Sequence, residues 1–367
     1  MAATTAATAA TATATGTATT AATAAATSAT FVFDRRAGRS RYVARAGGVM
    51  LVGALAALSC KPNVGLPSYL VTDYALLAVK GEPPEAKPGS SVTYSFLLAS
   101  PNGTVPDATA LWDICETPKP PSETNSVASA CTGPPDASAA SAGQTLTAPV
   151  PSNACRLFGP VPPTPVPGQP AVSPRNPDST GGYYLPVQLY LTSATAAATE
   201  PAAPMGPLMG FAMERIACGL ANAATDIIAE YTTDYTFNTN PVIDHVDVVD
   251  SAGNEADLAS GPSLVAGSQV TITVALAGPA PVFPVYDQVS GLLVQQTQSY
   301  SFFWFASGGS FAAAQTDVGG NADAALLADS NTWTVPPAAQ TTAYLWVVVR
   351  DSRGGTAFGS YQVTVVP

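Results

Sequence analysis

The sequence predicts an all-β protein whose main body consists of two tandem β-sandwiches. Two segments alternate between apolar and polar residues, as a strand with one buried face does: Ser91 to Leu98 and Gln269 to Leu276. Each segment follows a Gly turn, and each is followed by a short apolar run that contains a Trp. The C-terminus ends in two more alternating segments joined by a Gly-rich turn, which is the pattern of a β-hairpin.

The composition of the 367 residues excludes several classes of function. The chain has 14 Lys+Arg, 25 Asp+Glu, one His and only 11% charged residues. A nucleic-acid surface needs clustered Lys and Arg, so we expect no nucleic-acid partner. The sequence contains no G-x-S-x-G, phosphate-binding loop, dinucleotide fingerprint or H-E-x-x-H motif. We therefore expect no catalytic residues, no enzymatic activity and no cofactor.

The N-terminal tract, residues 1–30, contains 15 Ala and 12 Thr and no charged residue. It has no amphipathic period and nothing larger than methyl groups to bury, so we expect it to be disordered and of low complexity. An Ala-rich helix is the alternative, although Thr at this density disfavours it. A start codon placed too far upstream would also explain the tract.

Residues 31–59 have the order of a secretory signal peptide. An uncharged stretch, Ala46 to Ser59, follows five basic residues and precedes Cys60. Its apolar part, Val49 to Leu58, has the length of a signal-peptide core and is too short for a membrane-spanning helix. The basic residues are Arg35, Arg36, Arg39, Arg41 and Arg45.

The four residues Ala57-Leu58-Ser59-Cys60 resemble the lipobox of bacterial lipoproteins. The resemblance implies cleavage between Ser59 and Cys60 and lipidation of the Cys60 thiol, with residues 60–65 as a tether. An ordinary signal peptide with an incidental Cys is the alternative. By analogy with enteric bacteria, Lys61 rather than Asp after the cysteine favours the outer membrane, on its periplasmic or surface face. Two or three acyl chains anchor a protein durably.

The residues after Cys60 form an acidic body, with nine Lys+Arg against 24 Asp+Glu and a net charge of −15. Anionic headgroups repel such a body, so the lipid must supply the membrane anchor. This body contains four cysteines, which favours two disulfides in an exported chain. Three connectivities are possible, and we prefer Cys115–Cys131 and Cys155–Cys218 on proximity alone. The spacing of the cysteines does not match a zinc site.

An internal repeat divides the body into two copies. Ala86 to Tyr94 parallels Leu264 to Ile272 at a constant offset of 178 residues. Trp112 and Trp304 follow the alternating strands in the two copies. A core Trp at this place is similar to that of immunoglobulin-like sandwiches, although two unrelated core aromatics would give the same pattern. We expect domains at 66–239 and 240–367.

The second copy is the more regular one. Its first strand is expected over Val242 to Val249, and the segment from Tyr344 to Val366 resembles the last two strands of bacterial Ig-like and PKD-like domains. The boundary between the copies is expected at Asn238-Thr239-Asn240-Pro241, because Asn-Pro steps break regular structure.

The first copy carries a long insertion. Later strands are expected over Tyr183 to Thr192 and Gly210 to Cys218, and one short helix over Leu220 to Glu230. Between Glu116 and Thr180 lies a Pro-rich, loop-rich stretch, in or just before which three of the four cysteines occur. A stretch of this length is functional or held by disulfides, and we favour the second.

Candidate binding residues are few. His245 and Asp247 are expected to point to solvent, opposite Val246 and Val248, and a pair is too few ligands for a metal site. Two acidic loops, at 250–257 and 317–323, are rich in oxygen ligands but lack the calcium-loop spacing, so bound calcium is a minor alternative. Tyr344 and Trp346, if exposed, could bind a glycan.

Two classes of function follow. The leading prediction is an envelope lipoprotein without catalytic activity, a structural spacer or an adhesion module with an envelope protein or glycan as partner. The alternative is an extracytoplasmic ligand-binding, glycan-binding or hydrolytic protein with its site in the loops of the first copy. A concave pocket in the 116–180 stretch lined by two or more carboxylates would favour the alternative.

Overall fold

The computed structural model describes residues 66–118, 127–135, 141–160, 175–192, 207–220, 222–320, 327–337 and 342–367. The predictions for residues 1–30, for the signal peptide at 31–59 and for the tether at 60–65 lie outside these residues, and Ser59 and Cys60 are among them. The described residues all belong to one compact unit. No helix in the described ranges has the length and apolar character to cross a membrane.

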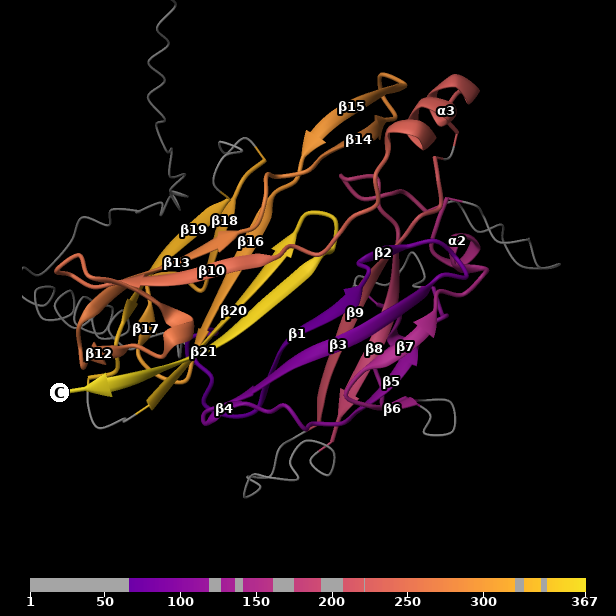
Figure 1. Cartoon of the computed structure of the whole chain (residues 1–367). Helices are drawn as coiled ribbons and strands as arrows, with labels where there is room; N and C mark the ends of the chain where they lie inside the picture. Colours follow the sequence, from indigo (N-terminus) through magenta and orange to yellow (C-terminus); the bar gives the residue numbers. More distant parts are fainter. Residues whose placement is uncertain are drawn as a thin grey trace, which may run out of the picture. The chain divides into compact units, whose positions relative to one another are not determined.

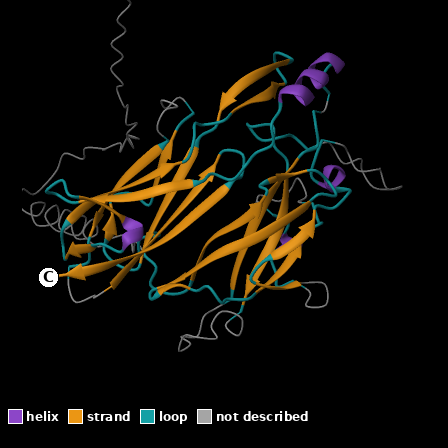
Figure 2. Ribbon diagram, viewed as in Figure 1, coloured by secondary structure: helices purple, strands orange, loops and turns teal. Residues whose placement is uncertain are grey.

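The fold is all-β, as predicted, and strands account for most of its regular structure (Figure 2). The first sandwich has two sheets. One has the order β1-β3-β4 with β7 also paired to β3, and the other has the order β2-β9-β8-β5-β6 (Figure 1). The strands are β1 (Ala75–Glu82), β2 (Glu85–Ala86), β3 (Ser91–Ser100), β4 (Gly103–Thr104), β5 (Ala110–Ile114), β6 (Ser141–Gly143), β7 (Leu146–Pro149), β8 (Tyr184–Leu191) and β9 (Leu208–Ile216).

The second sandwich also has two sheets, of orders β11-β10-β13-β19-β17 and β12-β21-β20-β16-β18. A separate hairpin, β14-β15, extends from it. The strands are β10 (Ile243–Val249), β11 (Glu255–Asp257), β12 (Ser263–Val265), β13 (Gln269–Leu276), β14 (Val282–Asp287), β15 (Leu292–Thr297), β16 (Tyr300–Ala306), β17 (Ser310–Phe311), β18 (Gln315–Val318), β19 (Ala328–Thr334), β20 (Thr342–Asp351) and β21 (Thr356–Val366).

The two sandwiches repeat one strand arrangement. In each, a short strand pairs in parallel with the last long strand, β2 with β9 and β12 with β21, and every other pair is antiparallel. In each, the Trp strand lies next to the last-but-one long strand, β5 beside β8 and β16 beside β20. This order is that of an immunoglobulin-like sandwich, which has its core Trp on the corresponding strand.

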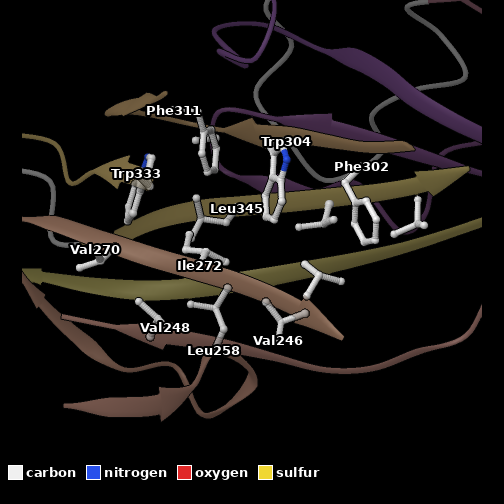
Figure 3. Close-up of a cluster of buried hydrophobic side chains, with 14 of the residues drawn as sticks. Val246, Val248, Leu258, Val270, Ile272, Phe302, Trp304, Phe311, Trp333 and Leu345 are labelled. Atoms are coloured by element: carbon white, nitrogen blue, oxygen red, sulfur yellow. The ribbon is translucent and has the colours of Figure 1, made fainter. Parts of the chain in front are cut away.

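The two tryptophans also make equivalent hydrogen bonds. The Trp112 indole N–H donates to the Gly143 carbonyl and the Trp304 indole N–H to the Thr316 hydroxyl, at 3.0 and 2.9 Å. Gly143 and Thr316 are each the strand partner of the residue two positions before the Trp. Both indoles are buried, and Trp304 packs in the core of the second sandwich (Figure 3).

The short helices and the expected insertion differ in detail from the prediction. The helix α3 spans Thr225–Asp234, so it starts and ends later than expected, and α2 spans Ala154–Leu157. Two 3₁₀ turns lie at Ser129–Cys131 and Leu258–Ser260. The described parts of the stretch from Glu116 to Thr180 contain loops but also supply β6 and β7, one strand to each sheet of the first sandwich. Strands this short carry little alternation, which is why the sequence did not predict them.

An apolar cluster joins the two sandwiches. It contains Ala78 and Leu97 from the first sandwich and Trp346 and Val348 from the second, all buried. The Trp346 indole N–H donates to the Thr104 hydroxyl at 2.9 Å, across the contact. The expectation of Trp346 as an exposed glycan platform is therefore wrong, because both faces of β20 are covered.

Candidate functional site

A buried ion pair marks one end of the first sandwich. Glu85 on β2 is the register partner of Arg215 on β9, and the Arg215 Nε lies 3.2 Å from a Glu85 carboxylate oxygen. Both side chains are almost fully buried. The guanidinium also donates to the Thr180 hydroxyl and carbonyl, at 2.7 and 2.9 Å. A Cβ at Gly182 would collide with this guanidinium, so the chain needs a glycine there.

The Glu85 carboxylate also binds the linker between the sandwiches. It accepts hydrogen bonds from the Tyr235 hydroxyl, at 2.7 and 2.9 Å, and from the Asn238 backbone N–H at 2.7 Å. Burial alone lowers the pKa of Arg215, but the acidic groups around it, Tyr235 and Glu85 first, raise it above the ordinary value. The Glu85–Arg215 pair therefore connects the β2–β9 strand pair to the linker.

The linker continues this network into the second sandwich. The Asn238 amide donates to both carboxylate oxygens of Asp351, and the Gln298 amide donates to the Asn238 side-chain oxygen at 3.2 Å. Arg353 is buried and donates to the Gln298 side-chain oxygen and to the Thr236 carbonyl. Every group in this chain of contacts has a partner, so the network satisfies its own buried charges.

Asn240 makes a second bridge. Its side-chain amide donates to the Gly81 carbonyl at 2.7 Å and to the Glu82 carboxylate at 2.8 Å, both in the first sandwich. Its side-chain oxygen accepts from the Thr356 backbone N–H, in the second, at 2.7 Å. The Asn-Thr-Asn-Pro segment that the sequence marked as a boundary thus holds the two sandwiches together.

A cavity of about 370 Å³ lies beside the ion pair. Tyr231 and Tyr235 are four residues apart at the end of α3, and their rings stack with centroids 4.7 Å apart. The Lys87 ammonium lies 5.2 Å from the centroid of the Phe237 ring. The cavity is lined by Glu85, Lys87, Gly181, Tyr183, Arg215, Ile216, Ala217, Cys218, Gly219, Tyr231, Thr232, Tyr235 and Phe237.

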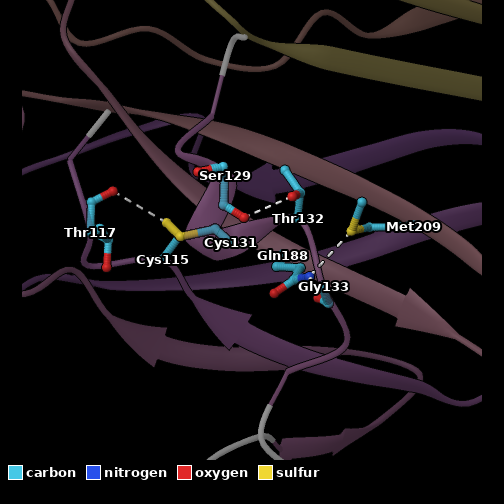
Figure 4. The surroundings of a disulfide bond; sticks show 8 residues. All are labelled: Cys115, Thr117, Ser129, Cys131, Thr132, Gly133, Gln188 and Met209. Atoms are coloured by element: carbon cyan, nitrogen blue, oxygen red, sulfur yellow. Dashed lines mark hydrogen bonds between the residues drawn. A yellow bond between two sulfur atoms is a disulfide. The ribbon is translucent and has the colours of Figure 1, made fainter. Parts of the chain in front are cut away.

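The two disulfides are Cys115–Cys131 and Cys155–Cys218, the pairing preferred from the sequence. Cys155–Cys218 joins α2 to the end of β9, and Cys218 forms part of the cavity wall. Cys115–Cys131 fastens the turn at Ser129–Cys131 to the end of β5 (Figure 4). In the same view, the buried Gln188 amide donates to the Gly133 carbonyl. The disulfides and this bond fix the described parts of the insertion.

His245 lies at the surface of β10, as expected. Its Nδ1 lies 2.8 Å from Asp244 and its Nε2 3.3 Å from Asp247. The hydrogen bond to Asp244 raises the pKa of His245 above its ordinary value. Val246 and Val248 point into the core. Within the described ranges, no group of three or more potential metal ligands comes together.

The first acidic loop needs no ion to explain its carboxylate. Asp250 accepts hydrogen bonds from the backbone N–H groups of Ala252 and Asn254 and from the Asn254 amide, at 2.8 to 2.9 Å. These bonds lower the pKa of Asp250. In the second loop, Asp317 accepts from Ser301 and Gln315. Residues 321–323 lie outside the described part.

A second cavity, of about 300 Å³, borders the insertion. Among its described lining residues Asp178 is the single carboxylate, and it accepts hydrogen bonds from Thr180, Gly182 and Tyr184. Neither of these two cavities has two carboxylates in its described lining, but a third cavity, of about 440 Å³, borders residues 176–179 and is lined by two, Asp178 and Asp287. A pocket of this kind is the feature that we expected to favour the alternative function. Asp178 accepts hydrogen bonds from Thr180 and Gly182, and Asp287 accepts from Val289 and Ser290.

The residues that line the 370 Å³ cavity, here called the tyrosine-lined cavity after Tyr183, Tyr231 and Tyr235, were not predicted from the sequence. A usable signal was the spacing of Tyr231 and Tyr235, because residues four apart on a helix share a face. The Glu85–Arg215 pair had no signal, since its partners are 130 positions apart.

No family model matches the chain, and no curated protein matches it. Among solved structures, it is similar to the crystal structure of dimeric latent PorU from Porphyromonas gingivalis, with 12% identity and a TM-score of 0.18. The match covers 81% of this chain and 24% of the PorU chain, and at this TM-score it carries no argument about function.

Proposed function

We propose that this protein is an exported, lipid-anchored envelope protein that acts as a rigid spacer or interaction module and has no catalytic activity. The observation that carries the proposal is the buried network through Asn238, which ties Glu85 of the first sandwich to Asp351 of the second. Because the polar groups of the linker are hydrogen-bonded to both sandwiches, the two sandwiches form one mechanical unit, as a spacer requires.

Two further features support export to an envelope. Disulfides persist in oxidising compartments, and the chain has two. The Ala57-Leu58-Ser59-Cys60 segment, with its lipobox resemblance, is the proposed site of the lipid, and Lys61 the reason for placing it at the outer membrane.

Metabolic labelling with a fatty-acid probe tests the anchor. The wild-type chain should incorporate the probe, and Cys60→Ala should abolish incorporation, whereas Cys155→Ala should retain it. Equal labelling of wild type and Cys60→Ala would refute the lipid anchor.

¹⁵N relaxation tests the rigid module. Amides of β3 and of β13 should report one common rotational correlation time. Two distinct times would show independent sandwiches and would overturn the spacer proposal.

The tyrosine-lined cavity favours a second candidate function, extracytoplasmic ligand binding. A concave site of several hundred Å³ with aromatic walls and a few placed polar groups is the usual form of a small-molecule site.

A further inference from the structure

The cavity beside α3 has a wall suited to a ring-bearing ligand. Tyr231, Tyr235 and Phe237 form a continuous aromatic group, because the Tyr235 ring stacks on Tyr231 and contacts Phe237 edge-on at 6.2 Å. Tyr183 completes the lining from the strand side. Such side chains combine a flat apolar face with a polar tip. The wall can therefore bind a ring that is itself both apolar on its face and polar at its edge.

The polar groups of the cavity favour a hydroxyl-bearing ring over a hydrocarbon. The Tyr183 hydroxyl has no hydrogen-bond partner among the described residues, and Tyr183 is largely buried. The Thr232 hydroxyl donates to the Ile228 carbonyl, which leaves its oxygen free to accept. Glycines at 181 and 219 both have positive φ, and no atom lies within 4 Å of where a Gly219 Cβ would stand. The lining is thus open at Gly219.

The charge of the cavity favours an anion. The Glu85 charge is compensated by Arg215, at 3.2 Å, so the pair leaves no net charge. Lys87 is exposed and forms no ion pair with any described residue; its ammonium lies over Phe237. One uncompensated cation therefore stands beside the aromatic wall of a chain whose net charge is −11. A carboxylate on the ligand would pair with it.

We propose that this cavity binds an acidic saccharide unit, with the sugar ring against the Tyr231–Tyr235–Phe237 wall and its carboxylate paired with Lys87. The inference goes beyond the spacer function and does not depend on the lipid anchor. It gives the envelope protein a specific contact with acidic glycans.

Titration of the full chain with two matched probes, followed by saturation-transfer NMR, tests the proposal. Methyl β-D-glucuronide and methyl β-D-glucoside differ only at C6, which is a carboxylate in the glucuronide and a neutral hydroxymethyl group in the glucoside. We expect the glucuronide to bind more tightly than the glucoside by up to about fivefold, since one exposed charge pair contributes up to about 1 kcal/mol. Lys87→Gln should remove that preference, and Tyr231→Ala should weaken both probes.

The matched control is Tyr190→Ala on β8, which removes a tyrosine that is not part of the cavity lining and should leave binding unchanged. Thermal unfolding of each variant verifies folding, and the exposed Lys87→Gln keeps the test valid if Tyr231→Ala fails to fold. Equal binding of both probes, no saturable binding, or tighter binding of benzoate would each overturn the proposal. None of these results alters the fatty-acid labelling, so the two failures are distinguishable.

Discussion

The Asn238 side chain donates hydrogen bonds to both carboxylate oxygens of Asp351, at 3.1 and 3.0 Å, across 113 positions of sequence. The Asn238 backbone N–H binds Glu85 in the other sandwich at 2.7 Å. One residue of the linker therefore donates hydrogen bonds to two buried carboxyl groups, one in each sandwich. Removing it would leave a buried acceptor unsatisfied, which costs more than the bond itself contributes.

Asn238→Ala should accordingly lower the free energy of unfolding by about 2–4 kcal/mol, because the buried Asp351 carboxyl group loses its amide donor. Burial already raises the pKa of Asp351 above its ordinary value, and the Asn238 bonds lower it, so the variant should raise it further. Urea denaturation measures the change. Thr239→Ala, at the exposed neighbouring position, should change stability by less than about 0.5 kcal/mol. Equal effects of the two variants would refute the bridging role.

Trp346→Ala should separate the unfolding of the two sandwiches. The indole is fully buried between them, and truncating a buried Trp costs about 3–5 kcal/mol. Calorimetry should show two transitions where the wild type shows one. Trp346→Phe keeps most of the packing and loses only the bond to Thr104, so it should cost less and keep a single transition. An unchanged thermogram for Trp346→Ala would contradict the interface.

Glu214 should make stability depend on pH. Burial, with the neighbouring charges of Glu85 and Glu82, raises the pKa of Glu214 from 4.5 to about 9, and one of its oxygens has no hydrogen-bond partner among the described residues. The folded state therefore binds the proton more tightly than the unfolded state does. Protonation of Glu214 therefore contributes fully to the free energy of unfolding below pH 4.5. This contribution is lost as the pH rises toward 9, by at most about 1.4 kcal/mol per pH unit.

Glu214→Gln should flatten this part of the stability profile, because an amide does not titrate. Chemical denaturation at several pH values between 5 and 9 measures it. Glu230→Gln, an exposed carboxylate on α3, is the matched control and should leave the slope as it is. A wild-type profile that rises with pH over this range would argue against a protonated Glu214.

The Cys155–Cys218 disulfide should contribute more to the free energy of unfolding than the Cys115–Cys131 disulfide does. Their sequence separations are 63 and 16 residues. Under the chain-entropy model, closing these loops contributes about 4 and about 3 kcal/mol. Paired Cys→Ser variants, unfolded in urea, measure the difference. A larger loss for the Cys115–Cys131 pair would show that the loops retain structure when unfolded.

The strands were predictable wherever their evidence was local. Ser91–Ser100 and Gln269–Leu276 alternate between apolar and polar residues because one face of each strand packs against a core. This period of two can be recognised from neighbouring residues alone. The core positions of Trp112 and Trp304 followed from the same repeat. The short strands β6 and β7 had no such signal, since three or four residues are too few to show a period.

Local pattern thus established the sandwiches, the repeat and the even set of four cysteines that form the two disulfides. The contact between the sandwiches could not be predicted from local pattern. Trp346 alternates like any half-exposed strand residue, and it is buried in a cluster that includes Ala78 and Leu97 of the other copy. The cavity could not be predicted in this way either. Its Arg215, Glu85 and Tyr231 come from three different elements, and only packing of the folded chain brings these side chains to the lining of one cavity.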